Sequence, residues 1–441
     1  MDCFKAYDIR GIYPYEVNEE FAFKFGRAVG KFLKAKKLVV CRDGRSSSND
    51  LFRSLVDGMS SVGCDVINIG RNSTPQFYFE VFSGTSDGGV MITASHNPKE
   101  YNGFKVCGID AKPIYLENGL LDIKKLMTED DNLKSNVLGH VVNKQISDEY
   151  VKFFSQFAVK LNKKLKIIFD TGNGMGITEV KALKRIYGSM LDETVMYSII
   201  DGEFPNHECD PSKLKNTEKL QMELARDGYD LGFALDGDAD RVVCFTKSGM
   251  KIPSDVLTAI LAVKTAKKGD KVGFEVRTSQ SVVEFLEKEG FVGRLYPSGH
   301  SLIKMNMIKD NCVFAGEKSG HYFYQSLHYV ESTLLTIMKV IEFYLERDIE
   351  VVAKEIMSKR ISLEEKNYTV TDKNKVLELI EKEFSDDKIV KVDGLSVYGL
   401  NYFFNIRKSN TENVIRLNIE GLNNKIVSEI LERIESIIAK F

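Results

Sequence analysis

Residues 231–245 read LGFALDGDADRVVCF. The apolar runs at its two ends, 231–235 and 242–245, are typical of buried β-strands, and five acidic or small residues and one arginine fill the loop between them. Similar apolar runs alternate with stretches of helical periodicity along the chain, at 38–40, 66–69, 90–92, 165–169 and 272–276. This alternation predicts α/β layers.

The loop places carboxylates at alternate positions, Asp236, Asp238 and Asp240, with one small residue between neighbours. Carboxylates spaced in this way can converge on one hard divalent cation, and Mg²⁺ is expected where phosphate oxygens complete the coordination. A solvated turn is the competing interpretation, because Asp and Gly are common turn residues. An EF-hand is disfavoured, because the glycine and glutamate that its loop requires are replaced by Arg241 and Lys247.

A second motif, TASHNP at 93–98, puts a hydroxyl on a turn just after an apolar run. Ser95 has an imidazole beside it, His96, and an amine ten residues later, Lys105. A Ser-His pair in a loop is usually a turn former, and no glycine lies two positions before or after Ser95, as the G-x-S-x-G motif of hydrolases would require. The acidic loop is therefore the expected source of reactivity, and Arg241 beside it offers a guanidinium fork for phosphate.

Five motifs, in this order, resemble those of the α-D-phosphohexomutase family, nearest its bacterial phosphomannomutase/phosphoglucomutase branch. They are an opening segment at 4–11 (FKAYDIRG), the serine loop at 93–98, the metal loop at 236–241, a sugar loop at 316–321 (GEKSGH) and a phosphate loop at 407–411 (RKSNT). The resemblance covers nearly the whole chain. It implies that Ser95 passes a phosphoryl group to a hexose phosphate, giving a hexose 1,6-bisphosphate, and then takes back the other phosphate.

The resemblance also implies roles for individual residues. The Mg²⁺ ligands would be a phosphate oxygen on Ser95 and the carboxylates of Asp236, Asp238 and Asp240. Lys105 and Arg10 would approach the same phosphate, and either Lys105 or His321 would serve as the general acid/base. The residues implied to contact substrate are Tyr7, Arg241, Arg277, His300, Glu317, Ser319, Arg407, Ser409, Asn410, Thr411 and Arg416.

The sugar preference is open between glucose and mannose, which differ only at C2. A loop that hydrogen-bonds the 3- and 4-hydroxyls of the sugar through Glu317 and Ser319 would accept both hexoses. The run YNGFK at 101–105 disfavours the amino-sugar branch, phosphoglucosamine mutase, in which an Asp-Asn-Gly-Ile-Lys-like run is usual. Many relatives carry lysine where this chain has Arg277, so the geometry of that contact is expected to differ.

Four domains around a central cleft follow from the resemblance: three similar mixed α/β domains and a smaller C-terminal α+β domain. Each domain would supply one loop, and we place the domains at 1–145, 146–250, 251–366 and 367–441. Helical periodicity in the last domain predicts a helix near 375–384 and a final helix that carries Ile426, Ile430, Ile434 and Ile437.

Composition favours a soluble enzyme of small molecules. The 441 residues include 61 Lys+Arg and 63 Asp+Glu, so no polybasic face for nucleic acid or a membrane is indicated. The family resemblance implies phosphosugars as the partners. Seven scattered cysteines without a C-x-x-C pair argue against a disulfide framework or a zinc site. Since neither a signal segment nor a membrane span is evident, we expect a cytoplasmic location. We also expect a monomer or weak homodimer.

Two other functional classes stay open at this point. A Mg-dependent sugar phosphatase of the aspartate-nucleophile type would use Asp236 or Asp238 as its covalent residue and leave Ser95 incidental. A phosphosugar-binding protein would keep the same side chains without turnover. Phosphate found on Ser95 would exclude the phosphatase.

Overall fold

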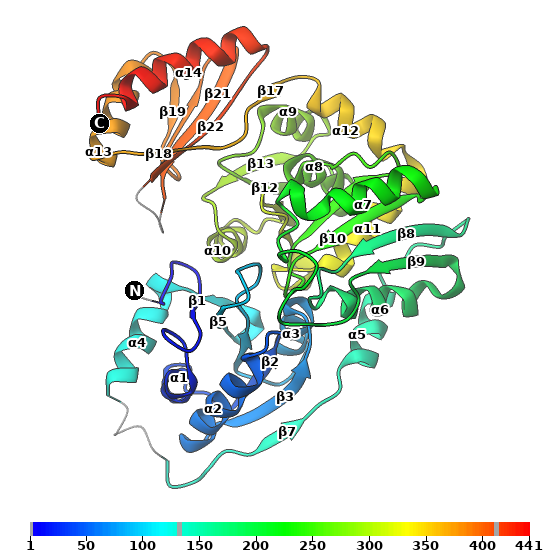
Figure 1. Ribbon diagram of the computed structural model, residues 1–441, viewed down its shortest axis with the longest axis vertical. Coiled ribbons are helices and arrows are strands. Elements are labelled where there is room, and N and C mark those ends of the chain that lie inside the picture. The colour runs from blue at the N-terminus through cyan, green and yellow to red at the C-terminus, as the bar shows by residue number, and fades with distance from the viewer. Residues whose placement is uncertain (1–2, 130–134, 410–413) are drawn as a thin grey trace. The chain divides into compact units, whose positions relative to one another are not determined.

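The computed structural model describes residues 3–129, 135–409 and 414–441 (Figure 1). The chain divides into two compact units, which are described separately. Unit 1 comprises Met1–Ile252 and Ser319–Glu346, and unit 2 comprises Pro253–Lys318 and Arg347–Phe441. The division passes through the predicted sugar loop, between Lys318 and Ser319.

The first sheet of unit 1 has a parallel centre. β2 (Lys37–Arg42) pairs in parallel with β3 (Asp65–Arg71) and β4 (Gly88–Ile92), whereas β5 (Tyr101–Gly108) is antiparallel to β4. All of β4 is buried, as expected of a strand that is covered on both faces. The other elements are β1 (Ile9–Ile12), β6 (Pro113–Ile114), β7 (Val141–Asn143), α1 (Glu19–Phe32), α2 (Ser48–Ser61), α3 (Thr74–Ser83) and α4 (Leu120–Thr128).

The second sheet of unit 1 has the order β11-β10-β8-β9. β8 (Leu165–Asp170) is parallel to β9 (Leu191–Met196) and β10 (Leu231–Leu235), and β10 is antiparallel to β11 (Val242–Thr246). Because Leu235 is paired with Val242, the acidic loop forms the tip of a hairpin, which confirms the predicted strand, loop and strand. The other elements of unit 1 are α5 (Ser147–Ser155), α6 (Gly176–Tyr187), α7 (Leu214–Asp227), β15 (Tyr322–Tyr324), β16 (Val330–Glu331) and α11 (Thr333–Glu346).

A buried carboxyl group ties three helices of unit 1 together. Glu179, on α6, accepts hydrogen bonds from Ser73, the N-cap of α3, and from the hydroxyl of Tyr150 on α5, the latter at 2.8 Å. Burial raises the pKa of Glu179 to about 7.

Unit 2 contains a parallel and an antiparallel layer. In the first, β12 (Lys271–Glu275) is parallel to β13 (Val292–Tyr296) and β14 (Phe314–Gly316). The second has the order β17-β22-β21-β20-β19, with β18 also paired to β22. Its strands are β17 (Ile361–Ser362), β18 (Lys366–Thr369), β19 (Lys388–Val390), β20 (Leu395–Tyr398), β21 (Tyr402–Lys408) and β22 (Val414–Gly421). The helices are α8 (Ser254–Thr265), α9 (Gln280–Lys288), α10 (His300–Asp310), α12 (Ile349–Met357), α13 (Lys373–Glu383) and α14 (Asn424–Ile438).

The antiparallel layer has its own apolar core. α13 and α14 lie against its sheet (Figure 1), and Ile430, Ile434 and Ile437 are buried there. The predicted helices at the end of the chain are thereby confirmed. Among the described residues, no helix is both long and apolar enough to cross a membrane.

Candidate active site

Ser95 lies in the loop that follows β4, with its side chain buried in unit 1. Its backbone φ is 50°, in the left-handed region. Ser95 Oγ donates a hydrogen bond to Asp236 Oδ2 at 2.8 Å and lies 3.2 Å from His96 Nδ1. Burial, and then the nearby guanidinium of Arg241, lower the pKa of His96 well below its ordinary value, so the ring next to the candidate nucleophile is neutral.

One arginine holds the backbone of the serine loop. Arg45 is buried and donates through Nη2 to the carbonyls of Ser95 and Asn97, at 2.8 and 2.6 Å. Its Nη1 donates to the carbonyls of Pro98 and Tyr101, at 2.7 and 2.9 Å. A single planar fork thus fixes four carbonyls around the nucleophile.

The three aspartates of the metal loop converge, and their ligand atoms lie within 4.8 Å of one another. Asp238 Oδ2 accepts hydrogen bonds from Thr74 Oγ1 and from Lys105 Nζ, each at 2.7 Å. Asp238 Oδ1 is buried and has no hydrogen-bond partner among the described residues. The two hydrogen bonds to Oδ2 fix the Asp238 carboxylate and leave Oδ1 in a position that suits a divalent cation. The residues present therefore fit a metal ion.

Cations already compensate part of the charge of this loop. Lys105 Nζ contacts both Asp238 and Asp240, and Arg241 Nε donates to Asp236 Oδ2 at 2.9 Å. Burial alone would lower the pKa of Lys105, but the carboxylates of Asp238 and Asp240 raise it above its ordinary value. The amine is therefore held charged, which suits an electrostatic contact or a proton donor better than a base.

Glycine is required where the two loops meet. A Cβ on Gly237 would lie 2.5 Å from the carbonyl oxygen of Ser95 and 2.9 Å from Cys209 Sγ. Neither distance is tolerated, so only glycine lets the metal loop pass this close to the serine loop.

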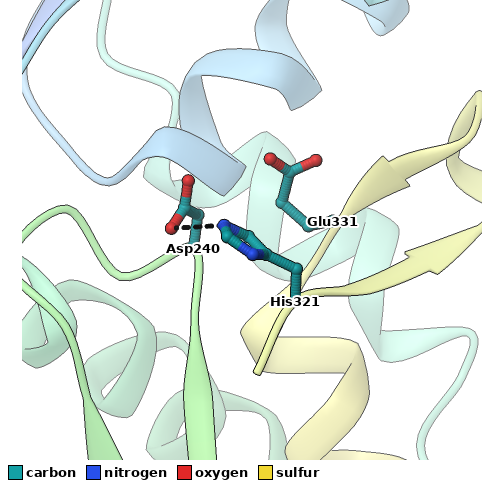
Figure 2. A group of neighbouring side chains, drawn as sticks. All are labelled: Asp240, His321 and Glu331. Carbon is teal, nitrogen blue, oxygen red and sulfur yellow. Dashed lines mark ion pairs between the residues drawn. The ribbon is translucent and has the colours of Figure 1, made fainter. Parts of the chain in front are cut away.

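His321 lies beside Asp240 of the metal loop (Figure 2). Its Nε2 lies 3.3 Å from Asp240 Oδ1, and its Nδ1 lies 2.7 Å from Ser319 Oγ. Both ring nitrogens thus have polar neighbours that fix its orientation. Glu331 of β16 is fully buried beside this pair, and ligand atoms of Asp240, His321 and Glu331 also lie within 4.8 Å of one another.

The opening segment adds a second arginine. Arg10, on β1, is held by Asp8 through Nε and Nη2, at 3.0 and 2.8 Å to Oδ2, and its Nη1 donates to Asn97 Oδ1 at 2.6 Å. Arg10 is thereby attached to the serine loop. Tyr7, also predicted at the site, is partly buried in the segment just before β1.

In unit 2, the candidate substrate residues gather around Glu275 at the end of β12. Its buried carboxylate accepts from Arg277 Nε at 2.8 Å, from the hydroxyl of Ser298 and from the backbone N–H of Lys318 at 3.1 Å. Glu317 Oε1 accepts from the N–H of Gly299 at 3.0 Å. These bonds bring the first half of the sugar loop to the turn before α10, whose first residue is the buried His300.

The two strands that flank the phosphate loop, β21 and β22, contribute Arg407 and Arg416, which lie near the same carboxylate as Arg277. Arg277, Arg407 and Arg416, which we call the guanidinium cluster, all lie near the carboxylate of Glu365. Arg416 Nη2 also donates to Ser409 Oγ at 3.4 Å. The predicted contacts Asn410 and Thr411 lie outside the described residues.

Family models match the chain in four consecutive segments. They are described as phosphoglucomutase/phosphomannomutase alpha/beta/alpha domain I at residues 1–134, domain II at 148–249, domain III at 253–360 and the C-terminal domain at 365–437. The chain belongs to the phosphoglucomutase/phosphomannomutase family.

Individual relatives agree with this membership. The chain is 34% identical to a phosphomannomutase from Methanocaldococcus jannaschii, over 99% of this chain and 97% of the relative. It is 32% identical to a phosphomannomutase/phosphoglucomutase from Pseudomonas syringae pv. tomato, over 95% and 91%. A crystal structure of a family protein from Burkholderia thailandensis superposes with a TM-score of 0.89 at 27% identity, covering 99% of this chain and 96% of that one.

The residues predicted from the sequence divide between the two units of this family member. Unit 1 holds Tyr7, Arg10, Ser95, Lys105, Asp236, Asp238, Asp240, Arg241, Ser319 and His321, and unit 2 holds Arg277, His300, Glu317, Arg407, Ser409 and Arg416. Sequence reasoning assigned no role to the residues that support them, namely Arg45, Thr74, Glu275, Glu331 and Glu365. None of these stands inside one of the five quoted motifs, so spacing within a motif gave no signal for them.

Proposed function

We propose that this phosphohexomutase interconverts the 1- and 6-phosphates of glucose and mannose through a phosphorylated Ser95 and a hexose 1,6-bisphosphate. The observation that carries the proposal is the buried contact of Ser95 Oγ with Asp236, inside an acidic loop that Lys105 and Arg241 partly neutralise. A serine in this setting can carry a phosphoryl group whose charge is compensated on several sides.

In the first half-reaction, the bond between phosphorus and Ser95 Oγ breaks, and a bond to the free hydroxyl oxygen of the hexose phosphate forms. The hydroxyl proton leaves the sugar, and Ser95 Oγ gains one. We assign the proton transfer to His321, because Ser319 and Asp240 fix its ring, whereas Lys105 is held charged between two carboxylates. The second half-reaction returns the other phosphate of the bisphosphate to Ser95.

Mg²⁺ is the proposed cofactor, and Asp236, Asp238 and Asp240 would hold it. When bound, it supplies positive charge at the transferred phosphoryl group. The chain's own contribution is to fix these carboxylates, to place Lys105 and Arg10 near the same phosphate, and to keep the nucleophile away from bulk water. Hexose 1,6-bisphosphate is the proposed activator, because it can phosphorylate Ser95.

Recognition of the sugar is assigned to the sugar loop, and recognition of its non-reacting phosphate to the guanidinium cluster near Glu365. Glu317 and Ser319 would bind ring hydroxyls, and the guanidinium cluster would bind the phosphate with Ser409, Asn410 and Thr411. His300 would line the same substrate path. The names of the relatives, phosphomannomutase and phosphoglucomutase, support both hexoses as substrates.

The test is ³¹P NMR of the purified protein with Mg²⁺ and a trace of glucose 1,6-bisphosphate. Mannose 1-phosphate, glucose 1-phosphate and glucosamine 1-phosphate are offered in turn. We expect conversion of the first two to 6-phosphates. Conversion of glucosamine 1-phosphate alone would move the chain to the amino-sugar branch, and release of inorganic phosphate would favour a phosphatase.

A further inference from the structure

Glu365 stands at the meeting point of three arginines from three separate stretches of unit 2. Its Oε2 lies 3.8 Å from Arg277 Nη1 and 3.4 Å from Arg407 Nη2, and its Oε1 lies 3.5 Å from Arg416 Nη1. Asn418 Nδ2 donates to Oε2 at 2.8 Å and holds the carboxylate in place. Partial burial alone would raise the pKa of Glu365, but the hydrogen bond from Asn418 and the three guanidiniums lower it below its ordinary value. The carboxylate is therefore ionised.

Arg277 divides its guanidinium between two carboxylates. Its Nε and Nη2 form a bidentate pair with Glu275, at 2.8 and 2.7 Å, and its Nη1 is left on the side of Glu365. Only a planar fork can do this, because a lysine ammonium is a single point of charge. Arg277 therefore links Glu275, which organises the first half of the sugar loop, to Glu365, which lies near Arg407 and Arg416.

The three contacts to Glu365 are longer than ordinary charged hydrogen bonds. The guanidiniums are thus drawn together by charge, and at Arg407 an N–H group remains to be directed at a ligand. Arg407 shows this directly: its side chain is about nine-tenths buried, and its Nε has no hydrogen-bond partner among the described residues. Three guanidiniums stand against the carboxylates of Glu275 and Glu365, so the cluster keeps a local excess of one positive charge, which attracts a phosphate monoester.

We propose that Glu365 is a positioning residue, which gathers Arg277, Arg407 and Arg416 at one point so that the guanidinium cluster binds the non-reacting phosphate of the hexose phosphate. The inference rests on the proposed function, since it specifies how that site recognises the phosphate. Without the carboxylate, three like charges would repel one another and spread apart, and the cluster would lose its shape before the substrate arrives.

The experiment compares Glu365→Gln with the wild-type chain in Mg²⁺-supplemented mutase assays with glucose 1-phosphate. We expect KM to rise about tenfold, a loss of about 1.4 kcal/mol, while kcat changes less than about threefold. Glu365→Asp should recover part of the affinity. The control is Glu383→Gln, which removes the carboxylate that pairs with Arg433 in the same antiparallel layer, outside the cluster, and should leave KM unchanged.

Two outcomes would overturn the inference. An unchanged KM in Glu365→Gln would mean that the carboxylate does not shape the cluster, and a lower KM would mean that it competes with the phosphate. Should Glu365→Gln fail to fold, Arg277→Lys serves instead, because it keeps the charge but loses the double pairing, and the same rise in KM is expected.

Failure of the proposed function gives a different result. If the wild-type chain shows no mutase activity, the inference is judged by calorimetric binding of inorganic sulfate, which needs no sugar and no turnover. Sulfate should then bind about tenfold more weakly to Glu365→Gln than to the wild-type chain. Equal sulfate affinity in the two proteins would overturn the inference.

Discussion

Thr74 offers the sharpest test of how the metal loop is held. Its backbone N–H donates to the carbonyl of Asp238 at 2.9 Å, and its hydroxyl donates to Asp238 Oδ2 at 2.7 Å. Thr74 is buried, so no water is at hand to replace the hydroxyl. Thr74→Val keeps the volume and the backbone contact and removes only the hydroxyl hydrogen bond.

The expected magnitude follows from the chemistry of this bond. A hydrogen bond to a charged group contributes about 1.5–3 kcal/mol, and loss of a residue that orients a metal ligand typically costs about 10–100-fold in metal affinity. The two ranges agree, because each tenfold change corresponds to about 1.4 kcal/mol. Lys105 still holds the same oxygen in the variant, so we expect the lower end, a Mg²⁺ affinity about tenfold weaker.

The assay is the Mg²⁺ concentration that gives half-maximal mutase activity, together with calorimetric Mg²⁺ binding. Thr74→Ser keeps the hydroxyl and should stay within about twofold of the wild-type chain. Thr258→Val is the matched control, because it removes a buried threonine hydroxyl that donates to the carbonyl of Ser254, at 2.9 Å, in the other unit. Wild-type Mg²⁺ affinity in Thr74→Val would refute the reasoning.

Three further predictions concern unit 1. Arg45→Lys should lower kcat on the order of a hundredfold, because an ammonium cannot hold four carbonyls of the serine loop at once; a change below twofold in the mutase assay would contradict this. Lys105→Met should destabilise the metal-free chain by about 3–5 kcal/mol, because it leaves two buried carboxylates uncompensated, and Mg²⁺ should raise its Tm by more than that of the wild-type chain. If Mg²⁺ raised the Tm of Lys105→Met and of the wild-type chain equally, Lys105 would not be compensating the charge of Asp238 and Asp240. The stability of Glu179→Gln relative to the wild-type chain should increase as pH rises. Burial raises the pKa of the Glu179 carboxyl from 4.5 to about 7, so the wild-type chain loses about 3 kcal/mol of folding free energy in total between about pH 4.5 and 7. Urea unfolding at pH 5 and pH 8 measures this difference, and parallel stability curves would exclude it.

The sequence predicted what local spacing can encode. The three alternating carboxylates at 236–240 can be recognised as a candidate metal site because their loop follows an apolar strand. Ser95 can be recognised as a candidate nucleophile because it follows the apolar run of β4. The periodic isoleucines of the last helix likewise identify its buried face. In each case, residues that act together are close in the chain.

The supporting residues could not be found in this way, because their partners are far away in the sequence. Thr74 is 164 residues from Asp238, and Arg45 is 50 residues from Ser95. Glu365 illustrates the same limit, since a single glutamate between two short strands carries no motif. Its partners become clear only when β21, β22 and the turn after β12 have brought their arginines together.

The central claim is that phosphate travels through Ser95, and isotopic labelling tests it most directly. The protein is treated with [³²P]glucose 1,6-bisphosphate and Mg²⁺, freed of excess label, digested and mapped by mass spectrometry, with Ser95→Ala as the control. We predict acid-stable label on Ser95 alone, which chases into hexose phosphates when unlabelled glucose 1-phosphate is added. Hydroxylamine-labile label on Asp236 or Asp238, or label that persists in Ser95→Ala, would contradict the account.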